Sequence, residues 1–164
     1  DGVMLDIEPY ISDSWKENPE EYMDRYISCM KKGYKFAQKN HLRTAICIPR
    51  HYDNQGLTSG LEELIKETCD EVAVMNYSCG NEIEAIRTEA ALSEKYGKEL
   101  HCILEFQEVG KHGLTENKTY RNKGIDNAKE TWEKLQKEYK NINVTRDYHW
   151  SRPVREMLEE KNAD

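Results

Sequence analysis

Short apolar runs alternate along the chain with longer segments in which apolar residues recur every three to four positions. Short continuous or alternating apolar runs predict strands, whereas a three-to-four spacing predicts helices. The predicted strands are Gly2–Ile7, Thr44–Pro49, Glu71–Tyr77, Leu100–Phe106 and Asn143–Trp150. The predicted helices are Pro19–Asn40, Gly60–Thr68, Glu82–Tyr96, Lys118–Tyr139 and Pro153–Lys161. Every predicted strand is therefore followed by a helix.

The first predicted helix carries the clearest apolar stripe. We expect its core-facing positions to be Tyr22, Tyr26, Cys29, Met30, Gly33 and Phe36. The helix before Leu100 is expected to stop at Gly97, because glycine adopts the left-handed conformation that ends helices. The polar segment Gly110–Asn117 is expected to be a loop, either a lid or an ordinary connection.

The alternation of strands and helices predicts the α/β class, with a parallel sheet and right-handed crossovers. Two architectures fit it: an open doubly wound sheet, or parallel (β/α) units that form part of a (β/α)8 TIM barrel. No glycine-rich phosphate loop follows any predicted strand, which disfavours a nucleotide-binding sheet. A complete barrel needs eight strands and roughly 250 residues. We therefore expect residues 1–164 to be one domain formed by strands four to eight of an incomplete barrel, with the N-terminal half missing.

Composition narrows the classes of partner. The 164 residues include 24 Lys+Arg and 31 Asp+Glu, for a net charge of −7, and ten Tyr and three Trp favour a folded chain. The acidic balance disfavours nucleic acid, which selects basic surfaces. No apolar run approaches the roughly 18 residues of a membrane span. Five cysteines form no CxxC pair and no zinc spacing, and the compartment stays open between secreted and cytoplasmic.

Polar and aromatic residues follow every predicted strand. In parallel α/β folds, chemistry gathers at the carboxyl ends of the strands, so these residues are the candidate site. They are Asp6, Glu8, Arg50, Asn76, Tyr77, Glu105, Gln107, His149 and Trp150. Carboxylates beside large aromatic rings suit a carbohydrate. The competing interpretation is that strands simply become polar where they reach solvent.

Asp6 and Glu8 are two residues apart, so on a strand they share one face. Val3, Leu5 and Ile7 take the other face, toward the covering helices. Two crowded carboxylates do not ionise independently, so the pKa of one is expected to rise. A carboxyl of raised pKa, here Glu8, can protonate a glycosidic oxygen. The alternatives are an exposed loop pair or a structural ion pair with Arg50 or Arg146.

The segment Asp1–Glu8 resembles the signature of family 18 glycoside hydrolases on the fourth barrel strand, which runs Asp-Gly-x-Asp-x-Asp-x-Glu. Asp1, Gly2, Asp6 and Glu8 match it, whereas Met4 replaces the innermost acid. Two strands later the family carries Met-x-Tyr-Asp, and residues 75–78 here read Met-Asn-Tyr-Ser. Trp150 is similar to the tryptophan that lies at the bottom of the family's sugar-binding site. The Asp-Ile-Glu-Pro-Tyr strand also resembles a group of uncharacterised bacterial barrel proteins.

This resemblance implies a mechanism in which the substrate's acetamido group is the nucleophile. Glu8 would be the general acid, Asp6 would orient the acetamido nitrogen, and Tyr77 would hydrogen-bond its oxygen. The chain also resembles retaining glycosidases that carry the acid/base on strand four and the nucleophile on strand seven. Glu8 and Glu105 occupy those positions, although Ile7 stands where that clan usually has Asn.

The expected partner is an oligosaccharide or polysaccharide, with Trp150 stacking on a sugar face. His149, Asn76, Gln107 and Arg50 are the other expected substrate-binding residues. No cofactor and no metal are expected, because the histidines have no HxH or HExxH spacing. A non-catalytic carbohydrate-binding barrel and a different cell-wall hydrolase on the same barrel remain the alternatives.

Overall fold

The computed structural model describes residues 1–163, with side chains for residues 1–160. The strands are β1 (Gly2–Asp6), β2 (Arg43–Pro49), β3 (Glu71–Met75), β4 (Glu99–Glu105) and β5 (Val144–His149). The helices are α1 (Asp13–Glu17), α2 (Pro19–Lys39), α3 (Thr58–Thr68), α4 (Glu82–Ala85), α5 (Arg87–Tyr96), α6 (Ile125–Glu138) and α7 (Ser151–Ala163). Three short 3-10 turns, η1 (Pro9–Ile11), η2 (Asp53–Gln55) and η3 (Lys111–Gly113), follow β1, β2 and β4.

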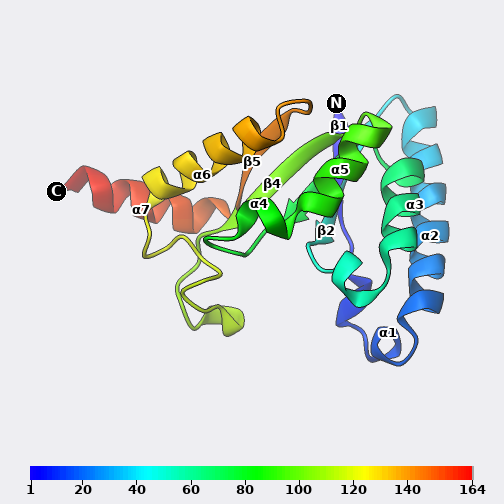
Figure 1. The fold of residues 1–164 in the computed structure, drawn as a ribbon, viewed down its shortest axis with the longest axis horizontal. Coiled ribbons are helices and arrows are strands. Elements are labelled where there is room, and N and C mark those ends of the chain that lie inside the picture. Colours follow the sequence, from blue (N-terminus) through cyan, green and yellow to red (C-terminus); the bar gives the residue numbers. More distant parts are fainter. Residues whose placement is uncertain (164) are drawn as a thin grey trace.

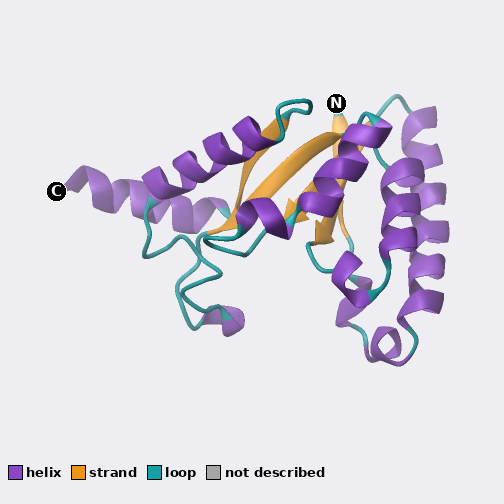
Figure 2. Ribbon diagram, viewed as in Figure 1, coloured by secondary structure: helices purple, strands orange, loops and turns teal. Residues whose placement is uncertain are grey.

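The sheet is entirely parallel, and its strands lie in the order β1-β2-β3-β4-β5. This confirms the α/β class, the parallel sheet and the alternation of strands with helices. Figure 1 shows the chain running through helices and strands in turn, and Figure 2 shows helices lying along the sheet. Because successive strands are neighbours and all run the same way, all five carboxyl ends meet at one edge of the sheet.

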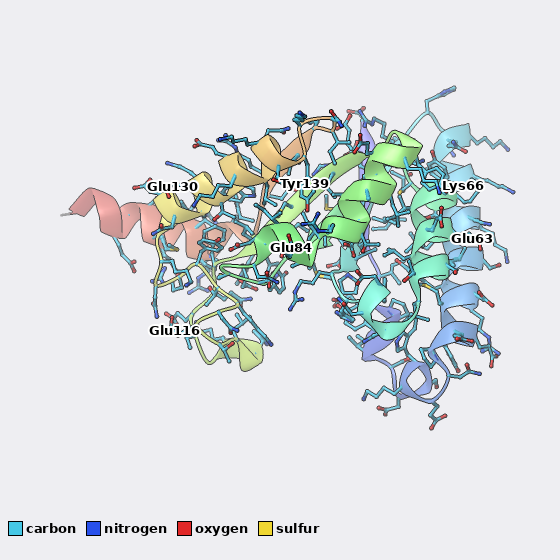
Figure 3. All side chains as sticks on the ribbon, viewed as in Figure 1. Glu63, Lys66, Glu84, Glu116, Glu130 and Tyr139 are labelled. Atoms are coloured by element: carbon cyan, nitrogen blue, oxygen red, sulfur yellow. The ribbon has the colours of Figure 1, made fainter. Side chains whose placement is uncertain are left out.

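The core lies between the sheet and the helices. Ile46, Ile48, Val72, Val74 and Leu104 of the inner strands have no more than a trace of exposure. They pack against the buried faces of α2, α3, α5 and α6. Charged residues such as Glu63, Lys66 and Glu130 lie on the outer helix surfaces (Figure 3). The rigid layer formed in this way holds the strand ends in place.

The buried face of α2 differs from the predicted stripe. It consists of Met23, Tyr26, Ile27, Met30 and Ala37. Phe36 is 69% exposed, and Cys29 and Gly33 are also exposed, so those three assignments were wrong. A stripe with a spacing of three to four residues drifts around a helix of this length, and packing against β2 and α3 decides which positions are covered.

Two predicted helices have different limits in the structure. The helix expected over Glu82–Tyr96 is divided into α4 and α5 at Ile86, and Gly97 ends it as predicted, with φ of +63°. The helix expected from Lys118 begins only at Ile125. The preceding turn is held by the Tyr120 amide, which donates to the Glu105 carbonyl oxygen (2.8 Å).

The edge strand β1 is more exposed than predicted. Leu5 packs against the core, but Val3 is 36% and Ile7 43% exposed. The helix α2 that follows β1 packs over β2 and α3, so only part of the outer face of β1 is covered. No helix within residues 1–163 has the length and apolar character needed to cross a bilayer.

Candidate functional site

A cleft of about 1150 Å³ opens where the five strands end. Its floor is the inner face of the sheet, including Met4, Cys47, Met75 and Ile103. Eight of the nine residues predicted from the strand ends line it: Asp6, Glu8, Arg50, Tyr77, Glu105, Gln107, His149 and Trp150. The parallel, sequential order of the strands brings these side chains together from positions up to 144 residues apart.

Asn76 is the exception, because it does not line the cleft. It is 1% exposed, and its side-chain amide donates to the Glu82 carbonyl oxygen (2.9 Å) and lies 3.5 Å from Cys102 Sγ. Adjacent residues of an extended segment point to opposite faces, so placing Tyr77 in the cleft turns Asn76 toward the helices. The prediction of Asn76 as a substrate-binding residue does not fit this position.

Asp6 and Glu8 lie in the cleft together with Met4, on the face that the two-residue spacing predicted. Burial raises the pKa of Asp6 and the negative charge of Glu8 raises it further, while His149 acts in the opposite direction. The sequence pattern assigned the raised pKa to Glu8, whereas in the structure the carboxyl whose pKa is raised is Asp6. Among the described side chains, neither carboxylate forms an ion pair with an arginine.

Tyr10 was not among the predicted site residues, and it is the closest partner of Glu8. Its hydroxyl donates a hydrogen bond to Glu8 Oε1. Burial and then this bond raise the pKa of Tyr10, so the phenol stays protonated as a donor. Its ring lies edge-on to His51, with ring centroids 5.2 Å apart, and both residues line the cleft. The sequence signal was present: Pro9 starts a short turn that returns Tyr10 toward Glu8.

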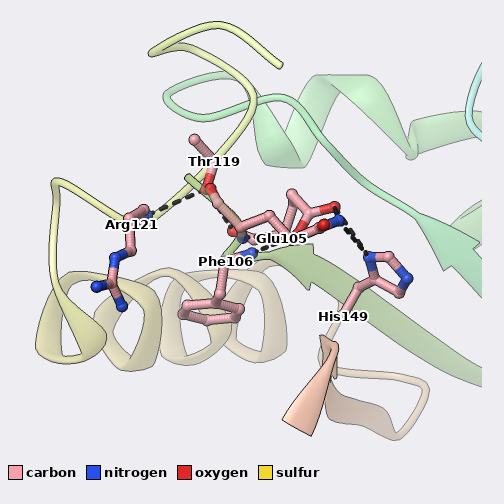
Figure 4. A network of polar contacts seen from close by, with 6 residues as sticks. Glu105, Phe106, Thr119, Arg121 and His149 are labelled. Carbon is pink, nitrogen blue, oxygen red and sulfur yellow. Dashed lines mark hydrogen bonds and ion pairs between the residues drawn. The ribbon is translucent and has the colours of Figure 1, made fainter. Parts of the chain in front are cut away.

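Glu105 and His149 form an ion pair at the ends of β4 and β5 (Figure 4). His149 Nδ1 donates to Glu105 Oε2 at 2.9 Å, in a parallel register that sets the two residues directly opposite each other. Glu105 is 2% exposed, whereas the His149 side chain is 48% exposed and lines the cleft. One partner is thus buried, and the other faces solvent.

Tyr77 and Trp150 are the aromatic walls of the cleft. The Tyr77 ring lies 6.1 Å from the His149 ring at an interplanar angle of 30°. Burial raises the pKa of Tyr77, and the nearby charges of Glu105, Asp6 and Glu8 raise it further. Trp150 is 46% exposed and follows His149 through a cis peptide bond. Trp150 therefore presents apolar ring surface to the cleft.

The segment after β4 reaches the rim of the cleft. His112, Gly113, Leu114 and Lys118 line it, so the predicted loop Gly110–Asn117 contributes to the site. An internal hydrogen bond joins the two ends of its turn, because the Gly110 amide donates to the Leu114 carbonyl oxygen (2.8 Å). It therefore forms a compact wall at the rim.

A second ionic cluster starts at the amino-terminal ends of β2, β3 and β4 and reaches the cleft through Asp147, which lines it. His101 bridges Glu71 through Nε2 and Asp147 through Nδ1, both at 2.8 Å. Hydrogen bonding to Asp147 raises the pKa of His101, although burial opposes this. Arg43 completes the cluster through Glu71 and Glu99. Glu71, Glu99 and His101 offer ligand atoms within 4.8 Å of one another, but ion pairs already engage them.

No protein-family model, curated protein or solved structure matches this chain.

Proposed function

We propose that this chain is the carboxyl-side part of a glycosidase-type (β/α)8 barrel and that it hydrolyses glycosidic bonds, with Glu8 as the general acid. The observation that carries the proposal is the cleft itself. It combines a close carboxylate pair, Asp6 and Glu8, with an exposed Trp150 at the carboxyl ends of parallel strands. Carboxyl groups beside an aromatic platform are the groups that glycoside hydrolysis uses.

In the proposed reaction, Glu8 transfers its proton to the glycosidic oxygen while the bond between that oxygen and the anomeric carbon breaks. The Tyr10 hydroxyl, already hydrogen-bonded to Glu8, stabilises the carboxylate left behind. The acyl oxygen of the substrate bonds to the anomeric carbon as the leaving group departs. Water then displaces that oxygen, adds its hydroxyl group to the anomeric carbon and returns a proton to Glu8. Asp6 lies beside Glu8 in the cleft and orients the acetamido group of the substrate by accepting a hydrogen bond from its nitrogen.

The sequence raised two mechanisms, one with the substrate's acyl group as the nucleophile and one with Glu105 as the nucleophile. The surroundings of Glu105 favour the first. A carboxylate nucleophile needs one oxygen free to form the covalent intermediate. Both oxygens of Glu105 instead accept hydrogen bonds, from the amides of Phe106 and Gln107 and from His149. Tyr77, in contrast, stands close enough to Asp6 and Glu8 to be influenced by both charges.

Substitution of Glu8 by glutamine tests this proposal. Glu8→Gln removes the acidic proton but keeps the shape, so turnover of aryl glycosides, including N-acetylated ones, should fall by roughly two to four orders of magnitude. Sugar affinity, measured by calorimetry, should barely change. Glu130→Gln, on the exposed face of α6, is the matched control and should retain wild-type turnover. Turnover that survives Glu8→Gln would contradict the proposed mechanism.

A second candidate function is glycan binding without hydrolysis. Met4 favours it, because this 52% exposed apolar side chain lies in the cleft where the resembling family has an acid. In a binding protein, wild-type turnover would be absent. Glu8→Gln would then weaken sugar binding, because it removes a charged acceptor for sugar hydroxyls.

A further inference from the structure

The carboxylate of Glu105 is buried and saturated with hydrogen bonds. Oε1 accepts from the backbone amides of Phe106 and Gln107, both at 2.8 Å. Oε2 accepts from His149 Nδ1 at 2.9 Å and from the Gln107 side-chain amide at 3.2 Å. Burial alone would raise the pKa of Glu105, but the bonds from His149 and Gln107 outweigh it and lower the pKa. Glu105 is therefore a fixed negative charge in the wall of the cleft.

Only one of the two imidazole nitrogens of His149 is hydrogen-bonded to Glu105. Nδ1 is bound to Glu105, which leaves Nε2 on the far side of the ring (Figure 4). Nε2 has no hydrogen-bond partner among the described residues, and His149 lines the cleft. A buried carboxylate that anchors one imidazole nitrogen fixes the ring's orientation and the location of its proton.

The groups around His149 also favour its charged form. Glu105 lies on β4, Asp6 on β1 and Glu8 just after it, the Tyr77 ring after β3, and the Gln107 amide 3.5 Å from Nδ1. Hydrogen bonding to Glu105 raises the pKa of His149; burial opposes this, and the charges of Glu105, Asp6 and Glu8 reinforce it. No cationic side chain is among these neighbours.

We infer that Glu105 is a positioning residue that holds His149 as an imidazolium, and that Nε2–H of His149 binds an acceptor-only oxygen of the substrate. An imidazolium nitrogen donates a charge-assisted hydrogen bond, which is strongest to a carbonyl or carboxylate oxygen and weaker to the less basic oxygen of a hydroxyl group. The substrate class is therefore a glycan with an acyl or carboxylate substituent. This inference rests on the proposed function and narrows its substrate.

The coupling between Glu105 and His149 is testable without any saccharide. The pH titration of the His149 ring, followed by NMR and assigned with His149→Gln, should have its midpoint moved to lower pH by Glu105→Gln. Glutamine keeps the size and an acceptor oxygen but removes the negative charge. The matched control Glu108→Gln lies three residues away on the exposed loop and should leave the midpoint unchanged. An unchanged midpoint in Glu105→Gln would overturn the inference.

Substrate selection is tested by calorimetry with three oligosaccharides: N-acetylated, uronate-containing and unsubstituted. Wild-type affinity for one of the first two should weaken as pH rises through the His149 titration. His149→Gln should lower that affinity roughly tenfold at neutral pH, the size of one charge-assisted hydrogen bond. The unsubstituted oligosaccharide, whose hydroxyl oxygens are weaker acceptors, should show both effects to a smaller extent. Equal pH dependence for all three would overturn the substrate assignment.

His149→Gln also serves if Glu105→Gln fails to fold, because His149 is exposed and Glu105 would keep its two backbone amides. Affinity for the substituted oligosaccharides that is unaffected by His149→Gln would overturn the role of Nε2. A wild-type protein that binds no saccharide, but whose His149 midpoint still falls in Glu105→Gln, would contradict the proposed function and support the coupling of the two residues.

Discussion

Glu89 is the most unusual single residue outside the cleft. It lies in α5 with no measurable exposure, and neither carboxylate oxygen has a hydrogen-bond partner among the described residues. Burial raises the pKa of Glu89 to about 7, its own backbone amide lowers it, and Asp53 and Arg50 exert smaller opposing effects. Arg50, which lines the cleft, is therefore near enough to Glu89 for its charge to affect that carboxyl group.

The titration of Glu89 makes stability depend on pH. The unfolded chain ionises this group near the ordinary glutamate pKa of 4.5, whereas the folded protein retains the proton up to about pH 7. Between those values the unfolded state gains free energy from ionisation and stability falls as pH rises. Glu89→Gln removes this loss and should raise the free energy of unfolding by about 3 kcal/mol at pH 8 relative to its effect at pH 4.

Urea unfolding at the two pH values measures the difference between variant and wild type. Glu94→Gln, on the exposed side of the same helix, is the control and should show no comparable pH dependence. A Glu89→Gln effect of equal size at pH 4 and pH 8 would show that Glu89 does not titrate as the structure indicates.

At the scale of elements, α2 and α3 pack against each other along an extensive contact. Gly60 lies in the first turn of α3 against Met23, which is 1% exposed. A Cβ atom added at Gly60 would lie 2.5 Å from Met23 Cγ, well inside van der Waals contact. The absence of a side chain at this position therefore allows the two helices to approach.

Alanine substitutions at two glycines test this packing. Gly60→Ala should destabilise the protein by about 1–3 kcal/mol, the usual effect of overpacking. Gly33→Ala is the matched control, since nothing lies within 4 Å of a Cβ added there in the middle of α2. It should stabilise the protein by about 0.5–1 kcal/mol, because alanine favours the helix. Urea unfolding measures both, and similar effects at the two sites would contradict the proposed close contact.

At the scale of the molecule, the sheet has two unpaired edges. On β1, Val3 and Met4 are 36% and 52% exposed, and on β5 Tyr148 is 50% exposed. An exposed apolar edge strand is a template for pairing with another chain. The isolated 164-residue chain should therefore associate in a concentration-dependent manner, through these edges.

Lysine at an edge position tests that association. Val3→Lys should shift the sedimentation profile toward monomer, because a charge on an edge strand opposes strand pairing. Phe36→Lys replaces a 69% exposed residue on the surface of α2 and should leave the profile unchanged. Association reduced equally by both variants would point to general hydrophobic contact instead of edge pairing.

Local patterns were sufficient for the elements and for most of the site. Apolar periodicity predicted the five strands, and their alternation with helices predicted a parallel sheet. In such a sheet all carboxyl ends meet at one edge, so a residue's place at a strand end implied its place in the cleft. Asp6, Glu8, Tyr77 and Trp150 could be assigned in this way because the assignment needs only chain direction and the two-residue period.

Contacts between distant residues required the tertiary structure. Glu105 and His149 are 44 positions apart, and the register of β4 with β5 alone makes them partners. Packing likewise buried Ala37 and left Phe36 in solvent, although both are apolar residues of α2 that continue a spacing of three to four positions. The sequence determined which chemical groups reach the cleft, whereas register and packing decided which of them are buried, paired or free, because those properties depend on neighbours that no local period specifies.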